Sequence, residues 1–395
     1  MKQTLPQPAA KPRFEILDGL RGVAALTVVI FHIFEAYSPG PVYQIVNHGY
    51  LAVDFFFALS GFVIGYAYDS RWTSMSISAF FTRRLVRLQP MVVMGSLIGA
   101  LLFYFAASPI CPAVEQTSLK GLAILFMLSI FLLPSPSSLD GKGWGESYSL
   151  NGPMWSLMYE YIANILYATV VRHFPKWLLA LSVAASALLT VDVALNIDLF
   201  HMLENRTFQI NTMIGGWSLN ADQLYIGSAR LLYPFFCGLL VYRLGKTISV
   251  RGAFWWCSLA VVALLAAPRI GGEEAGWQNG LYEAVAIIMV FPLIVMTGAG
   301  SKVTGKRSVK ACRWLGEISY PLYLSHYPLI YIYFSWVSTH REAPLSIHIF
   351  AGIALFVISI ALAQACLRLY DAPLRKWLSA RLGHHRPKPE PAGNK

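Results

Sequence analysis

Eleven long apolar runs constrain this chain of 395 residues more than any other feature. They lie near residues 20–36, 50–68, 90–108, 119–133, 153–171, 177–195, 225–242, 254–268, 280–298, 317–336 and 347–369. A helix needs about 20 apolar residues to cross a bilayer. Only 13% of the chain is charged, against about 25% in soluble domains. Continuous runs also exclude the alternation of a membrane barrel. We therefore predict an all-α, polytopic helix bundle in a lipid bilayer.

Basic residues between the runs indicate the topology, because loops rich in Lys and Arg stay in the cytoplasm. The basic loops hold Lys2, Lys11 and Arg13; Arg71, Arg83, Arg84 and Arg87; Arg172 and Lys176; Arg243, Lys246 and Arg251; Lys302, Lys306, Arg307, Lys310 and Arg313; and Arg375, Lys376, Arg381, Arg386 and Lys388. These basic loops all lie on the same side of the membrane only if the stretch 88–133 crosses the membrane an odd number of times. We therefore predict ten membrane spans, with both termini in the cytoplasm. Either 90–108 or 119–133 would then be re-entrant or lie at the membrane interface. Eleven spans are the alternative.

The remaining composition sets the domain plan and excludes several partners. We predict an N-terminal tail over 1–13, one membrane domain over 14–378 and a disordered Pro-rich tail over 379–395. The net charge of +11 comes without a nucleic-acid-binding motif, so no nucleic-acid partner is expected. The five cysteines form no CxxC pair and no metal spacing. We expect neither a disulfide framework nor a metal site.

The first apolar run carries a polar stripe. Arg21 and His32 are eleven residues apart, which is about three helical turns with an offset of roughly 20°. Both side chains therefore share a face, about 16 Å apart along the axis. Asp18 and Glu35 extend this stripe by one turn at each end. Ionisable groups inside a membrane helix indicate a functional site. Alternatively, Arg21 extends to the headgroups and His32 only packs.

Further ionisable groups interrupt the later apolar runs. Asp54, Glu160 and His326 each lie inside a predicted span and are candidates for a shared polar cavity. Structural cross-links between helices are the alternative. Arg84 and Arg87 are three residues apart and would present neighbouring guanidinium groups on a helix. Such a pair can bind phosphates, although a plain membrane anchor has the same sequence.

Five motifs occur in order along the chain. They are Leu17-Asp-Gly-Leu-Arg-Gly-Val-Ala-Ala25 with His32 following Arg21, Val53-Asp-Phe-Phe-Phe-Ala-Leu-Ser-Gly-Phe62, Arg83-Arg-Leu-Val-Arg87 with Pro90, Trp155-Ser-Leu with Glu160, and Ile318-Ser-Tyr-Pro-Leu-Tyr-Leu-Ser-His326. With these motifs, residues from about 14 to 376 resemble the acyltransferase family 3 membrane proteins. The chain departs from the family pattern at Met158-Tyr159, Pro321 and Ser325.

The resemblance implies an acyltransferase of a bacterial inner membrane. Its donor would be acetyl-CoA or another acyl-CoA, with no tightly bound cofactor. Its acceptor would be a carbohydrate hydroxyl, as in lipopolysaccharide O-antigen or exopolysaccharide. The family's functional residues fall on Arg21, His32, Arg84 and Arg87.

These residues predict a mechanism. A sugar hydroxyl needs a base, and histidine suits neutral pH, so His32 is the predicted general base. A transient acyl-His32 is the second possibility. Arg21, Arg84 and Arg87 would bind the CoA phosphates. Glu160 or Asp54 would orient His32 or a neighbouring group.

Two other roles for these polar groups stay open. His326 is expected as a second polar group in the cavity of His32. The competing function is a proton-coupled transporter or flippase, in which Asp54, Glu160, His32 and His326 form a proton relay. An anchored scaffold without chemistry is the third reading. Consumption of a CoA thioester separates the enzyme from the transporter.

Overall fold

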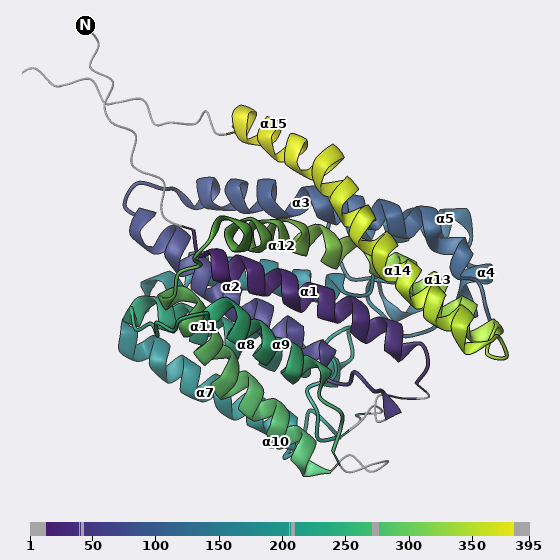
Figure 1. The fold of residues 1–395 in the computed structure, drawn as a ribbon, viewed down its shortest axis with the longest axis horizontal. Coiled ribbons are helices and arrows are strands. Elements are labelled where there is room, and N and C mark those ends of the chain that lie inside the picture. Colours follow the sequence, from purple (N-terminus) through teal and green to yellow (C-terminus); the bar gives the residue numbers. More distant parts are fainter. Residues whose placement is uncertain are drawn as a thin grey trace, which may run out of the picture.

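The fold, described by a computed structural model, is a bundle of helices with no strand among the residues that the structure describes (Figure 1). Those residues are 13–38, 40, 43–204, 206, 210–270 and 276–382. In order, the helices are α1 (Glu15–Glu35), α2 (Ala52–Tyr68), α3 (Ile77–Leu102), α4 (Ala113–Gln116), α5 (Leu119–Ile130), α6 (Met154–Thr169), α7 (Lys176–Leu195), α8 (Ala221–Leu244), α9 (Ala253–Ala266), α10 (Trp277–Val285), α11 (Phe291–Gly300), α12 (Lys306–Ser325), α13 (Tyr327–Thr339), α14 (Leu345–Ala365) and α15 (Ala372–Leu382). The π-helical turns η7 (Ala286–Val290) and η8 (Cys366–Asp371) join α10 to α11 and α14 to α15. The predicted polytopic membrane bundle is confirmed.

The basic loops meet at one end of the bundle, which we call the basic end. Seven helical stretches of the described chain are long and apolar enough to span a membrane. Arg313, at the start of α12, pairs with Glu15 at the start of α1, with 2.7 Å between Nη2 and Oε1. Arg243 at the end of α8 pairs with Asp69 after α2 at 2.8 Å. At the opposite end, the loop end, the amide of His48 donates to the carbonyl of Leu265. This grouping agrees with the ten-span arrangement.

The apolar run 119–133 forms a short helix, α5. Its 12 residues are about 18 Å long, against about 30 Å of hydrocarbon. It runs antiparallel to α3. Tyr104, just after the end of α3, donates to the carbonyl of Thr117 before α5, whereas Gln89, near the middle of α3, donates to that of Ile130 at the end of α5. The run 90–108 lies within the spanning stretch Ile77–Ala106. The segment 131–153 after α5 is irregular apart from the 3₁₀ turn η5 (Ser137–Leu139). Irregular backbone is tolerated at membrane depth where it lines a cavity.

Glycines let the central helices touch backbone to backbone. A Cβ on Gly61 of α2 would lie 2.0 Å from the carbonyl oxygen of Phe235 on α8, and one on Gly238 would lie 2.0 Å from that of Ala58. Gly95 and Gly99 of α3 face the carbonyls of Leu324 and Leu150 in the same way. Close packing of this kind lets membrane helices associate without a hydrophobic driving force. Gly61 with Gly65 and Gly95 with Gly99 are GxxxG pairs, and their contacts show that they serve helix packing.

Gly61→Ala is expected to destabilise the fold by about 1–3 kcal/mol, because the added methyl group meets the α8 backbone and forces the helices apart. Thermal unfolding in detergent measures the loss. Gly121→Ala on α5 is the control, since its Cβ would lie no closer than 3.4 Å to any neighbour. Equal stability of the two variants would contradict this packing.

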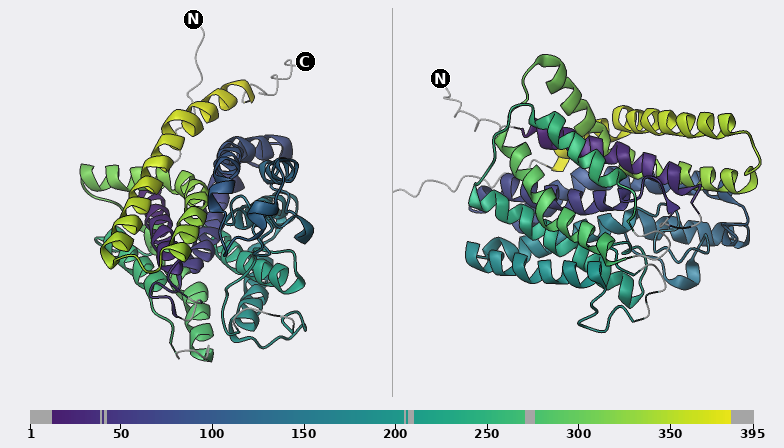
Figure 2. Two further views of the ribbon diagram at one scale, coloured as in Figure 1. Left: turned by 90° about the vertical axis from the view of Figure 1, so that its right-hand side faces the viewer. Right: turned by 60° about the horizontal axis from the view of Figure 1, so that its bottom comes forward.

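The last helical stretch extends beyond the bundle. Leu345–Leu382 contains 38 residues, about 57 Å of helix, which exceeds the bilayer core. Figures 1 and 2 show α15 projecting from the bundle. Helix α15 continues to Leu382, four residues into the tail predicted as disordered. Residues 1–12 and 383–395 lie outside the described residues. The five cysteines are all free and buried.

Candidate functional site

Two cavities open into the bundle from its two ends. The arginine cavity, of about 530 Å³, is lined at the basic end by Arg13, Arg21, Arg84, Arg87 and Arg375, with Asp18, Glu160, Glu317 and Asp371. The histidine cavity, of about 690 Å³, is lined towards the loop end by His32, Glu35, Glu146, Asp222 and Arg230, with Trp144, Trp155 and Trp217. The polar stripe of α1 serves both, because Arg21 lines the first cavity and His32 the second.

The guanidinium groups of the arginine cavity differ in how they are held. Arg84 is 4% exposed and pairs with Glu160 at 2.6 Å. Arg21 donates to the hydroxyl of Ser319 at 2.7 Å and to the carbonyl of Gly316 at 2.8 Å. Asp18 lies 3.8 Å from Arg21 and also pairs with Arg13. Several fixed, convergent cations form a site for an anionic group such as a phosphate.

Arg87 lines the same cavity without a fixed partner. Within the described part of the chain it makes no hydrogen bond or ion pair at contact distance, whereas Arg13, Arg21, Arg84 and Arg375 each have a carboxylate nearby. A guanidinium group without a carboxylate partner keeps its donors available for a ligand. Arg87 is thus the cation best placed to bind an incoming anion.

His32 is oriented by its own helix. Its Nδ1 lies 2.6 Å from Oε2 of Glu35, one turn further along α1. When Nδ1–H donates to this carboxylate, Nε2 carries the lone pair and can accept a proton. The expected partners were Glu160 or Asp54, but Glu160 lies beside Arg84 in the other cavity and Asp54 pairs with Arg230. Glu35 fills the orienting position instead.

His326 lies directly behind His32. The two ring centroids are 5.6 Å apart, and His326 is fully buried. Its Nδ1 lies 2.9 Å from the carbonyl of Leu322, and its Nε2 has no hydrogen-bond partner among the described residues. His326 does not itself line the histidine cavity, so it contacts His32 from inside the protein. The edge of the Tyr327 ring completes this cluster, with its centroid 4.8 Å from that of His32.

The two cavities meet at a narrow wall. Val53 of α2 and Tyr323 of α12 line both of them. The Tyr323 hydroxyl is held 2.7 Å from that of Ser156 on α6. Pro321, which departs from the family pattern, lies in the same stretch of α12 and lines the arginine cavity. A donor bound at one end and an acceptor bound at the other would approach each other at this wall.

A buried ion pair fixes the α2–α8 contact beside the histidine cavity. Arg230 is 1% exposed and pairs with Asp54 at 2.7 Å. Its other donors reach the carbonyls of Gly215 and Tyr50. Arg230 was not predicted from the sequence, although an ionisable group inside an apolar run, here 225–242, is the same signal that indicated Asp54.

Asp54→Ala is expected to lower the stability by about 3–5 kcal/mol, because it leaves a buried guanidinium group without its counter-charge. Thermal unfolding in detergent checks this. The double variant Asp54→Leu with Arg230→Met should recover most of the loss, since neither charge then remains buried. A double variant as unstable as Asp54→Ala would contradict the pairing.

A second buried acid supports the loops around the cavity. Glu283 of α10 accepts hydrogen bonds from the hydroxyls of Tyr50 and Thr212 and from the amide of Met213. His48, in the loop before α2, lies 3.8 Å from the same carboxylate. Burial lowers the pKa of His48 to about 4, so its ring stays neutral near pH 7. This network holds Tyr50, which lines the histidine cavity.

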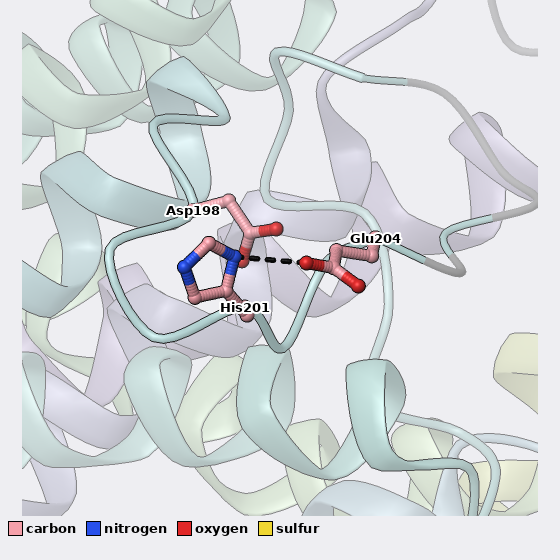
Figure 3. A group of neighbouring side chains, drawn as sticks. All are labelled: Asp198, His201 and Glu204. Carbon is pink, nitrogen blue, oxygen red and sulfur yellow. Dashed lines mark ion pairs between the residues drawn. The ribbon is translucent and has the colours of Figure 1, made fainter.

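A histidine and two carboxylates also meet on the surface. Asp198, His201 and Glu204 have ligand atoms within 4.8 Å of one another, on the loop after α7 (Figure 3). Such side chains can bind Zn²⁺. Here, however, Nδ1 of His201 pairs with Glu204 at 2.8 Å and Asp198 accepts from the amide of Leu203. The three side chains therefore lie close together because of an exposed ion pair and a local backbone hydrogen bond.

The fold is that of a polytopic membrane protein whose helix bundle encloses an arginine cavity and a histidine cavity with shared lining residues. The profile of the acyltransferase domain family matches residues 14–366. The chain belongs to this family, acyltransferase family 3, so the predicted family and enzyme class are confirmed.

Relatives support this assignment. The chain is 34% identical to "Protein 2 in picA locus" of Rhizobium radiobacter over 175 residues, which are 42% of this chain and 85% of that protein. It is 23% identical to the peptidoglycan O-acetyltransferase OatA of Listeria monocytogenes over 91% of this chain and 55% of OatA. The O-acetyltransferase OatA of Staphylococcus aureus is also 23% identical, over 91% of this chain and 57% of that protein. The chain thus spans about half the length of the OatA proteins. No solved structure matches significantly.

Proposed function

We propose that this protein moves an acetyl group from acetyl-CoA, bound in the arginine cavity, to a carbohydrate hydroxyl in the histidine cavity. One observation carries the proposal most directly. The unpaired Arg87 and the Glu35-oriented His32 line separate cavities that meet at Val53 and Tyr323. Phosphates bind guanidinium groups, and the extended arm of CoA carries its thioester away from its phosphates. The names of the OatA relatives favour acetyl as the acyl group.

In the proposed reaction, the acceptor hydroxyl gives its proton to Nε2 of His32 while its oxygen attacks the thioester carbonyl carbon. The C–S bond breaks, the acetyl ester forms, and the CoA thiolate leaves and takes a proton from imidazolium or water. Glu35 stabilises the imidazolium that forms, as a carboxylate does beside a catalytic histidine. In the two-step variant, the acetyl group first bonds to His32 and then passes to the acceptor.

Position in the cell is part of the same proposal. The basic end would face the cytoplasm, which supplies acetyl-CoA, and both termini would lie there. The membrane would be a bacterial inner membrane. The acceptor would be a glycan such as lipopolysaccharide O-antigen or exopolysaccharide, presented at the loop end.

Release of free CoA by the purified protein in lipid tests the function. The protein is given acetyl-CoA with a panel of glycan acceptors, beside a His32→Ala variant of equal abundance. We expect acceptor-dependent CoA release and an acetylated sugar with the wild-type protein alone. Absence of release with every acceptor would overturn the proposal and favour the transporter or flippase.

A further inference from the structure

The histidine cavity is acidic, in contrast to the arginine cavity. Three carboxylates line it, and they come from three separate segments: Glu35 from α1, Glu146 from the segment 131–153, and Asp222 from the first turn of α8. Arg230 is the one Lys or Arg among the described residues that line it, and Asp54 neutralises this group from behind. The lining therefore carries an excess of negative charge.

The partners of these carboxylates do not cancel that excess. Glu146 accepts a hydrogen bond from the hydroxyl of Tyr331, and Asp222 accepts one from the side-chain amide nitrogen Nε2 of Gln223 at 3.1 Å. In the described part of the chain, neither carboxylate has an ion pair with Lys or Arg at contact distance. Both accept from neutral donors. Burial raises the pKa of Glu146 to about 7, so this carboxylate carries its full charge in the cavity only above that pH.

Two buried cations lie nearby without lining the cavity. Lys142 donates to the carbonyl of Ser149, and its Nζ lies 3.8 Å from the centre of the Tyr331 ring. Arg206 donates to the carbonyls of Thr212 and Ile214. Because neither lines the histidine cavity, neither is placed to bind a ligand there.

The segment that presents Glu146 is well ordered. The carboxylate of Asp140 accepts hydrogen bonds from the backbone amides of Lys142, Gly143 and Gly145. Gly143 and Gly145 adopt φ values of +83° and +71°, which favour glycine. The position of Glu146 is thereby fixed by a tight turn, as a residue that contacts a ligand requires.

We infer that the histidine cavity selects an acceptor sugar that carries no negative charge, and that Glu146 and Asp222 provide this selectivity. The inference rests on the proposed function and names the acceptor class. Ionised carboxylates accept hydrogen bonds from sugar hydroxyls or a sugar ammonium group. They repel a carboxylate or phosphate on the acceptor, and poor solvation in a cavity strengthens that repulsion. The half-buried ring of Trp217 adds an apolar face for a sugar ring.

Matched pairs of acceptors test the inference. Each pair is one glycoside carrying a lactyl ether, once as the free acid and once as its methyl ester, so that size is nearly constant and charge changes. Several hexoses and hexosamines are used as the parent sugar. The rate of CoA release from acetyl-CoA gives kcat/KM for each acceptor. We expect the ester to exceed the acid at least tenfold in every pair that reacts.

Two variants assign the effect to residues. Glu146→Gln and Asp222→Asn keep side-chain size and should each reduce the acid–ester difference at least threefold, with an unchanged KM for acetyl-CoA. Glu115→Gln, on the short helix α4 and outside both cavities, is the matched control and should leave the difference unchanged. The inference would be overturned if the acid reacted as fast as the ester or faster, or if the two variants had no effect. The proposed function would still stand in each of these cases. No CoA release with any acceptor would overturn the proposed function and this inference with it.

Discussion

Replacing His32 with alanine is expected to lower the rate of acetyl transfer by a factor of about 10² to 10⁴, the usual contribution of a positioned general base. His32 is the one histidine among the described residues that line the histidine cavity, since His326 does not line it. The loss should fall on kcat, because the donor binds to the arginines at the other end. Initial rates of CoA release at saturating acetyl-CoA measure it.

Two variants make the His32 result specific. His173→Ala changes a histidine outside both cavities, whose Nε2 accepts from Arg172, and should keep full activity. Glu35→Gln should retain a hydrogen bond to the ring but lose the charge that stabilises imidazolium, so we expect an intermediate loss. Full activity of His32→Ala at normal membrane abundance would contradict the proposed chemistry.

Arg87→Ala is expected to raise the KM for acetyl-CoA by about ten- to a hundredfold, the equivalent of a hydrogen bond to a charged group at about 1.5–3 kcal/mol. Thermal stability should not change, because Arg87 makes no hydrogen bond or ion pair at contact distance within the described chain. The KM for the acceptor should also stay the same. Steady-state kinetics with each substrate varied in turn separates these effects.

Neighbouring arginines provide the contrast. Arg84→Ala should raise the KM for acetyl-CoA and also lower stability, because Glu160 then loses the cation 2.6 Å away. Arg83→Ala is the matched control, since Arg83 is exposed and contacts only the sulfur of Met75 among described residues. Identical donor KM values for Arg87→Ala and Arg83→Ala would show that Arg87 does not bind the donor.

Much of the fold could be predicted because lipid leaves few choices. Apolar runs predict the helices, and loop charges predict an odd number of crossings in 88–133. The sequence did not show which of the two runs there forms the shorter helix; in the structure this is α5, which packs along α3 through the contact of Gln89 with the carbonyl of Ile130. Helical periodicity also placed Arg21 and His32 on one helix face. It could not show that they open into two different cavities, because this depends on how α2 and α12 cross α1.

Long-range pairings were the part that sequence could not provide. The sequence allowed Glu160 to orient His32, but in the structure Glu160 pairs with Arg84, which is 76 positions away. Glu35 was identified as part of the stripe, and its local spacing from His32 already permits the contact seen. The sequence did not indicate Glu146 as a cavity residue, because it lies in an irregular segment. Long-range hydrogen bonds place this segment, one from Tyr331 to Glu146 and one from Ser147 to the carbonyl of Trp217.

Transfer between the two ends of the bundle is the central claim, and sidedness in proteoliposomes tests it most directly. Protein of known orientation is reconstituted, with acetyl-CoA at the basic end and the acceptor sugar at the loop end. We predict acetylated sugar at the loop end and free CoA at the basic end, both lost in His32→Ala. Acetylation that occurs only when both substrates are on the same side would contradict the account.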